Sequence, residues 1–327
     1  MMRTALTAAL KTAVTGALFY LLFRKVDVAE FAATLRLARY DILALSFLIL
    51  WIGHIMCVFR WRMLMRPVMP APSVWNLLGI YCIGLFFNLA FPTVVGGDVV
   101  KMYYAGKSSR RFAQSFAATF LDRDTGMLAM MIIAVIATLV HPVRLAGIPV
   151  LTIIWSAFAA FIVANVVIFA PGLHRLFVGR LRRFGLGRLA GKIDTLSGVF
   201  QAIGKYPGML ALSLGVSLVN QLLVISVTWL VAVGLHIPLA YPYFLVFVPT
   251  ITLISMIPVS LNGMGLREYA FVALFSGVGV DRESSVALGL ISSAIIVLSA
   301  IPGGMIYIFF RNRADLEQMA KLETDLS

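Results

Sequence analysis

The sequence predicts an all-α integral membrane protein, a polytopic bundle of helices, and three observations support this prediction. The chain has 327 residues, of which 61% are hydrophobic and only 13% are charged. Its mean hydropathy is +0.96, which no ordinary soluble domain reaches. The apolar residues fall into runs long enough to cross the roughly 30 Å hydrocarbon core of a bilayer.

The charged and reactive residues exclude several other classes of protein. There are 27 Lys and Arg against 14 Asp and Glu, a net charge of +13. These basic residues punctuate apolar segments, so we expect loops held against the anionic cytoplasmic leaflet and no nucleic-acid binding. Cys57 and Cys82 lie inside apolar runs and predict no disulfide. We expect no metal and no other cofactor, because the four histidines lack ligand spacing and no nucleotide-binding loop is present.

The first half of the bundle is predicted at about residues 42–170. Trp61 beside Arg60 and Arg62 is typical of a helix that leaves the bilayer on the positive side. The run that follows is broken by proline and glycine, and its second arm is too short to cross the membrane alone. The predicted elements are an uncleaved helix at 4–23, an amphipathic connector at 24–41, a span at 42–59, a hairpin or re-entrant element at 74–105 with its motif at 88–101, and spans at 113–140 and 148–170.

A basic cytoplasmic loop at 172–207 separates the two halves and fixes the orientation. Apolar residues alternate with its charges, which fits either a helix on the anionic leaflet or a solvated loop. The second half is predicted at about 208–310, and a short cytoplasmic tail follows at 311–327. Its elements are a span at 209–235, an inbound segment at 243–257, a half-helix at 269–280, a re-entrant motif over 255–280 and a span at 286–310.

The first interruption runs from Pro92 to Lys101 and contains Gly96, Gly97 and Asp98. Backbone that is freed at membrane depth needs protein or water as a partner, because lipid offers none. Glycines followed by an acid can form a turn and a helix start whose free N–H groups attract an anion, with Lys101 one turn on. The alternative is a structural bend that Asp98 caps.

The second interruption begins at Pro258 and has the same order of proline, glycine and charge. Asn262 and Gly263 predict a turn, and Gly265 admits close approach of another backbone. Arg267 can hold a phosphate group bidentately. Glu268 could pair with Arg267 or carry a proton, and a structural ion pair between the halves is the alternative.

A third polar group, Asp122-Arg123-Asp124, lies inside a predicted span. We expect Arg123 to pair with Asp98 or with substrate, and Asp122 to balance charge. The three residues superficially match the D-x-D metal motif of glycosyltransferases, but that motif belongs to a soluble nucleotide-binding domain, which this chain lacks, so we expect no metal binding. Asn220 and Gln221 should face the bundle interior, where an interhelical hydrogen bond is favoured over substrate contact.

In this arrangement the first interrupted element enters from the cytoplasm and returns there, and the second enters and returns on the other side. Two such elements are typical of inverted-topology halves with a site between them.

These residues together resemble the membrane domain of the lysylphosphatidylglycerol synthase (multiple peptide resistance factor) family. The resemblance rests on Phe87-Asn88, Pro92, Gly96-Gly97-Asp98 with Lys101, Asp122-Arg123, and the run from Pro258 to Glu268. It covers essentially the whole chain, although Lys101 stands where many relatives have arginine. In that family the membrane domain is regarded as a lipid flippase, often fused to a soluble aminoacyltransferase. Because this chain ends soon after its last predicted span, the resemblance implies the flippase-like membrane domain without the aminoacyltransferase.

We therefore expect a lipid flippase-like transporter of the cell inner membrane, with both termini cytoplasmic. Its substrate would be a phospholipid or other lipid with an anionic or aminoacylated headgroup, bound by Arg267, Lys101 and the glycine motifs. Asp98 and Glu268 would balance charge or carry a proton. Two alternatives stay open, namely a membrane-embedded transferase acting on a lipid-linked substrate and a non-transporting partner of a lipid-modifying enzyme. We expect no enzyme activity, and a homo-oligomer remains open.

Overall fold

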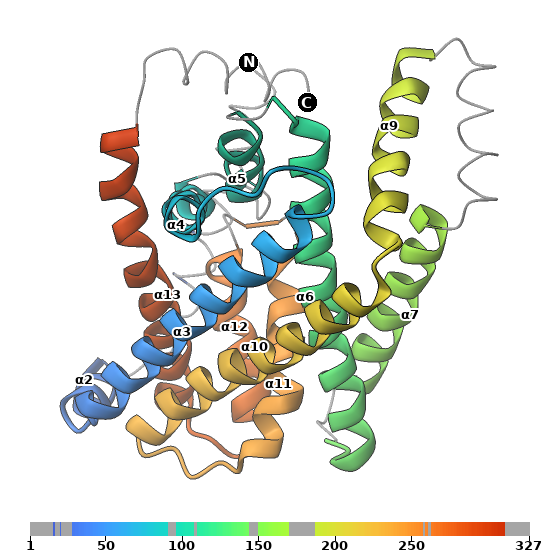
Figure 1. Cartoon of the computed structure of the whole chain (residues 1–327). Helices are drawn as coiled ribbons and strands as arrows, with labels where there is room; N and C mark the ends of the chain where they lie inside the picture. Colours follow the sequence, from blue (N-terminus) through green and yellow to red (C-terminus); the bar gives the residue numbers. More distant parts are fainter. Residues whose placement is uncertain are drawn as a thin grey trace.

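A computed structural model describes residues 16, 20, 28–90, 96–107, 110–143, 150–169, 187–257, 259–260 and 263–310. These residues form eleven helices and no strand, which confirms the all-α prediction (Figure 1). Four helices are long and apolar enough to cross a membrane. The helices are α2 (Val28–Arg36), α3 (Tyr40–Met65), α4 (Val74–Ala90), α5 (Gly96–Lys107), α6 (Phe112–Val140), α7 (Val150–Phe169), α9 (Gly187–Gly204), α10 (Pro207–Gly234), α11 (Tyr241–Ser255), α12 (Leu266–Ser276) and α13 (Arg282–Phe310).

Helices α3 and α10 pack against each other as an antiparallel pair and cross the front of the molecule together in Figure 1. Near the start of α3, the Arg39 N–H donates to the carbonyl of Gly234 at the end of α10. Near the other end of the pair, Arg60 of α3 bonds to Ser217 of α10. Small residues bring the two helices close together, because a Cβ on Gly53 would lie 2.8 Å from the amide oxygen of Asn220.

Helices α4 and α5 form a helical hairpin whose open end lies where α3 ends and α6 begins. Gly84 of α4 lies against Lys101 of α5, and Asn88 lies against Gly97, so the two helices run antiparallel. Arg111, just before α6, donates to the carbonyl of Val68, just after α3. The tip of this hairpin, which contains Pro92, lies outside the described residues.

Helices α11 and α12 form a second hairpin that opens at the opposite end of the bundle. The rings of Phe244, near the start of α11, and Phe275, near the end of α12, are 5.3 Å apart. His141, just after α6, contacts Tyr243 at this same end. The two hairpins therefore open at opposite ends of the bundle.

Each hairpin packs against helices of the other part of the chain. Helix α4 contacts α13, and α11 contacts α6. Two buried apolar clusters follow from this arrangement, one around Phe244, Phe247 and Phe275 and the other around Trp61 and Tyr103. The order of a long helix, two shorter ones and a long helix occurs twice, in α3 to α6 and in α10 to α13.

The predicted elements agree with these helices to within a few residues, except that α3 continues past Phe59 to Met65. The connector contains the short helix α2, and part of the basic loop forms α9. Both cysteines are free and buried, as expected. The expected helix at 4–23, most of the basic stretch at 170–186 and the tail at 311–327 lie outside the described residues.

Candidate functional site

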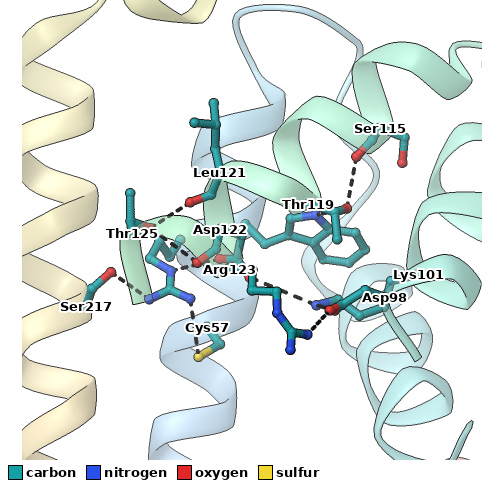
Figure 2. Close-up of polar contacts among 12 residues, drawn as sticks. Cys57, Asp98, Lys101, Ser115, Thr119, Leu121, Asp122, Arg123, Thr125 and Ser217 are labelled. Atoms are coloured by element: carbon teal, nitrogen blue, oxygen red, sulfur yellow. Dashed lines mark hydrogen bonds and ion pairs between the residues drawn. The ribbon is translucent and has the colours of Figure 1, made fainter. Parts of the chain in front are cut away.

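Three helices, α3, α5 and α6, contribute to a largely buried group of charged side chains in the interior of the bundle (Figure 2). Asp98 of α5 accepts from Lys101 Nζ across 3.1 Å and forms an ion pair with the Arg123 guanidinium of α6. Asp122 accepts from Arg60 Nε of α3 across 2.7 Å, and Lys101 Nζ lies 3.9 Å from its other oxygen. Two carboxylates and three cations thus form one connected network, which we call the charge cluster.

The Lys101 ammonium lies among carboxylates and aromatic faces. Its Nζ is 5.1 Å from the ring centroid of Trp61 and 5.0 Å from that of Tyr81. An aromatic face attracts a cation, most strongly where water is excluded. The residue is only 7% exposed. Lys101 was expected to face a bound anion, but in this structure its ammonium is directed at Asp98 and Asp122.

The backbone around Lys101 is shaped by the absence of side chains at two glycines. A Cβ on Gly84 would lie 2.7 Å from Lys101 Cγ, and a Cβ on Gly97 would fall on the carbonyl oxygen of Gly84. The Asn88 side chain accepts a hydrogen bond from the Gly97 N–H across 2.9 Å. The glycine motif therefore allows α4 and α5 to approach closely, and this approach buries the lysine stem.

Arg60 belongs to the charge cluster, but the sequence analysis did not identify it as a site residue. Its position next to Trp61 and Arg62 suggested the basic end of a span, but α3 continues and Arg60 is only 5% exposed. Its Nε bonds to Asp122, and its Nη1 donates to Ser217 of α10 across 2.6 Å. A signal was present in the sequence. Asp122 lies inside a predicted span and needs a cationic partner, and Arg123 cannot be the sole partner of both Asp122 and Asp98.

Uncharged polar residues extend the cluster toward α10. Gln221 donates from Nε2 to the Gly126 carbonyl of α6 across 3.0 Å, which confirms the predicted interhelical hydrogen bond. Trp61 donates from its indole nitrogen to Thr119 across 3.0 Å. Asn220 also faces the interior, but its side-chain oxygen has no hydrogen-bond partner among the residues that the structure describes. The interface of α3, α6 and α10 therefore contains several polar side chains beside the charge cluster.

The second motif forms a tight turn before α12. Gly263 and Gly265 have φ values of +75° and +79°, in the left-handed region that glycine adopts without strain. Glu268, only 1% exposed, accepts from the Gly265 N–H across 2.6 Å and from Ser293 of α13 across 2.6 Å. The carboxylate caps α12 and links it to α13.

Arg267 and Glu268 do not form the ion pair that was considered from sequence. The Glu268 carboxylate is directed at Gly265 and Ser293, and no ion pair joins it to Arg267 in the described part of the chain. Arg267 is partly buried in the first turn of α12, at the positive end of the helix dipole. Its guanidinium has no hydrogen bond to a described residue, so it is available to an anion.

The structure thus brings together one set of predicted residues and places the other elsewhere. Asp98, Lys101, Asp122 and Arg123 share the charge cluster, whereas Gly263, Gly265 and Glu268 form the α12 turn. Within the described ranges, no hydrogen bond or ion pair joins the two sets. Asn262 and Pro258 lie outside those ranges. No group of His, Cys, Asp and Glu there could hold a metal ion.

Comparison with known proteins gives one family. A sequence model described as "Lysylphosphatidylglycerol synthase TM region" matches residues 8–303, which is most of the chain. No curated protein and no solved structure matches.

Proposed function

The chain belongs to the lysylphosphatidylglycerol synthase transmembrane-region family, and from this premise we propose that it moves a lipid between the leaflets of the inner membrane. The headgroup is anionic or aminoacylated. It crosses along the polar interior of the bundle while the acyl chains stay in the surrounding lipid. Such a path lowers the cost of carrying a charge through hydrocarbon.

The observation that carries this proposal is the charge cluster itself. Buried ions cost free energy even when they are paired, so they are retained in membrane helices mainly where they serve a function. The charge cluster has a net charge of +1, because it contains three cations, Arg60, Lys101 and Arg123, and two carboxylates, Asp98 and Asp122. An anionic headgroup balances this excess. Arg123, about one-third exposed, is the cation of the cluster that is most open to such a ligand.

Arg267 supplies a second anion contact in our proposal. A guanidinium binds phosphate through two parallel hydrogen bonds, and the start of α12 adds its dipole and free N–H groups. Glu268 is already held by Gly265 and Ser293, so it does not neutralise the guanidinium by a direct contact. We assign Arg267 to the headgroup phosphate and Glu268 to holding the turn that aims it.

The two hairpins support alternating access to this path. One opens where α3 ends, the other opens at the far end, and each packs against the opposite part of the chain. In transporters built from two halves of inverted topology, exchanging the conformations of the halves gives two equivalent states, each open to one side. We propose that α4–α5 and α11–α12 are the corresponding moving elements.

Charge at the two ends of the bundle supports a cytoplasmic location for the end of α3. Several basic residues gather there, namely Arg62, Arg66, Lys107, Arg110, Arg111 and Lys205. The opposite end mixes both signs, with Arg36, Arg39 and Arg282 against Glu30, Asp41, Asp281 and Glu283. An excess of Lys and Arg marks the cytoplasmic side.

Transport of labelled lipid in proteoliposomes tests the proposal. Purified protein should move labelled phosphatidylglycerol, or its aminoacylated form, between leaflets without forming a new lipid. Asp98→Asn, which removes the shared partner of Lys101 and Arg123, should abolish this movement. Asp41→Asn is the matched control, because Asp41 pairs with Arg39 at an exposed end of α3. A new lipid species without movement would instead establish the transferase. If lipid neither moves nor is converted, the transporter is left without support.

A further inference from the structure

His54 is a partly buried titratable group in the middle of α3 that the proposed lipid path does not use. Its Nε2 lies 3.3 Å from Ser299 Oγ of α13. The ring is flanked by two aromatic rings, with centroids 5.7 Å away at Trp51 and 5.6 Å away at Tyr81. The imidazole therefore lies where α3 and α4 of the first half meet α13 of the second.

The hydrogen bonds at Ser299 assign the imidazole tautomer. Ser299 is buried, and its hydroxyl donates to the carbonyl of Ile296 across 2.7 Å. A hydroxyl has only one hydrogen, so toward His54 it can only accept. Nε2 must then carry the proton, and the lone pair of Nδ1 is left as a proton acceptor. Within the described residues Nδ1 has no hydrogen-bond partner.

The cationic form of His54 would meet the charge cluster through Tyr81. The ring of Tyr81 contacts His54, and Lys101 Nζ lies 5.0 Å from the centroid of the same ring. On α3 itself, Cys57 and Arg60 follow within two turns, and Arg60 is held by Asp122 of α6. Helix α13 offers Ser299, and α10 offers the uncharged Asn220 next to Gly53. None of the carboxylates that the structure describes contacts the imidazole, so a proton there adds positive charge to a region already rich in it.

We propose that His54 is a proton-binding site and that its protonation loosens the hold of Trp61, Tyr81 and Asp98 on Lys101. Two cations at one Tyr81 ring repel each other strongly in an interior of low dielectric constant. The imidazolium also uses both ring N–H groups as donors, so Nδ1 needs a new acceptor and the packing of α3 against α13 must adjust. Proton uptake thus opens the charge cluster. The coupling of this step to lipid movement rests on the proposed function.

The fluorescence of Trp51 reports the protonation directly, because an imidazolium in contact with an indole quenches its emission. Purified protein is titrated from about pH 8 down to about pH 3, that is, to well below the range in which histidine ordinarily titrates. We expect one quenching step that disappears in His54→Gln, since glutamine keeps a donor for Ser299 but cannot take up a proton. Ser299→Ala removes an acceptor of the imidazolium and should shift the step to lower pH.

Two matched variants keep this test decisive. His141→Gln changes a histidine that contacts Tyr243 at the end of α6, and it should leave the step unchanged. Trp51→Phe should remove the step while leaving the fold intact. A step that persists in His54→Gln, or wild-type protein without any step, would overturn the proposal.

Lipid movement measured at the same pH values separates this inference from the proposed function. If the quenching step is present and no lipid moves, proton binding at His54 stands and the transport proposal fails. If lipid moves with a pH dependence that His54→Gln leaves unaltered, transport stands and the coupling through His54 is wrong.

Discussion

Arg60 on α3 and Asp122 on α6 form a buried ion pair, with 2.7 Å between Nε and the carboxylate oxygen and 5% and 6% of the two side chains exposed. The pair joins two helices that are long enough to span a membrane, and Arg60 bonds in turn to Ser217 of a third, α10. It therefore fixes the mutual position of three membrane helices at the depth of the charge cluster.

Removing one partner of this pair should destabilise the protein strongly. Arg60→Ala leaves Asp122 buried with Lys101 as its nearest cation, and breaking a buried ion pair on one side costs about 3–5 kcal/mol. We expect a large loss of monodisperse protein on heating, measured by size-exclusion chromatography in detergent. The double variant Arg60→Met/Asp122→Leu leaves no unpaired charge at this position and should recover much of the stability. Equal stability of wild type and Arg60→Ala would show that the pair does not hold the helices.

Arg267 is expected to act on lipid binding with little effect on stability. Arg267→Ala removes a guanidinium that has no hydrogen bond to a described residue, so thermal stability should change little while retention of anionic lipid, measured by native mass spectrometry, falls sharply. Arg267→Lys keeps the charge but loses the bidentate geometry, and it should retain an intermediate amount. Tyr269→Ala, at a half-exposed position on the same helix, serves as the control. Undiminished lipid retention in Arg267→Ala would remove this residue from the proposed site.

The sequence was sufficient to predict most of the fold because apolar runs and their breaks decide helices in a membrane protein. Every described helix from α3 to α13 has a counterpart in the predicted segments. The ends were less certain, as α3 shows. Arg60 was assigned to an interface, since a tryptophan flanked by arginines is typical of one. In the structure α3 continues to Met65, and the contact with Asp122 places Arg60 in the interior.

The pairing of side chains was harder to predict than the helices that carry them. Arg123 was expected to partner Asp98 or substrate, and in the structure it forms an ion pair with Asp98. Glu268 follows Arg267 directly, yet its carboxylate turns back to the Gly265 N–H, because the turn leaves that donor otherwise unsatisfied. Lys101 is held by the faces of Trp61 and Tyr81 from two other helices, and no spacing along the chain reveals such a contact.

Gly303 on α13 should tolerate no larger residue. A Cβ at this position would fall on the carbonyl of Cys82 in α4, which is backbone and cannot rotate away. Gly303→Ala must therefore separate α4 from α13, and overpacking of this kind costs about 1–3 kcal/mol or more. Gly215→Ala on α10 is the matched control, because no atom lies within 4 Å of its added Cβ. Thermal unfolding in detergent compares the two, and equal midpoints would mean that α4 and α13 do not pack this closely.

The orientation in the membrane can be tested by labelling single cysteines from each side. Ser73, between α3 and α4, and Ala240, just before α11, are small exposed residues at opposite ends of the bundle. With Cys57 and Cys82 replaced by alanine, Ser73→Cys in intact cells should resist a membrane-impermeant maleimide, because the basic end of α3 faces the cytoplasm. Ala240→Cys should react in the same cells, and both should react after permeabilisation. The reverse pattern would invert the proposed topology and place the opening of the α4–α5 hairpin on the outer side.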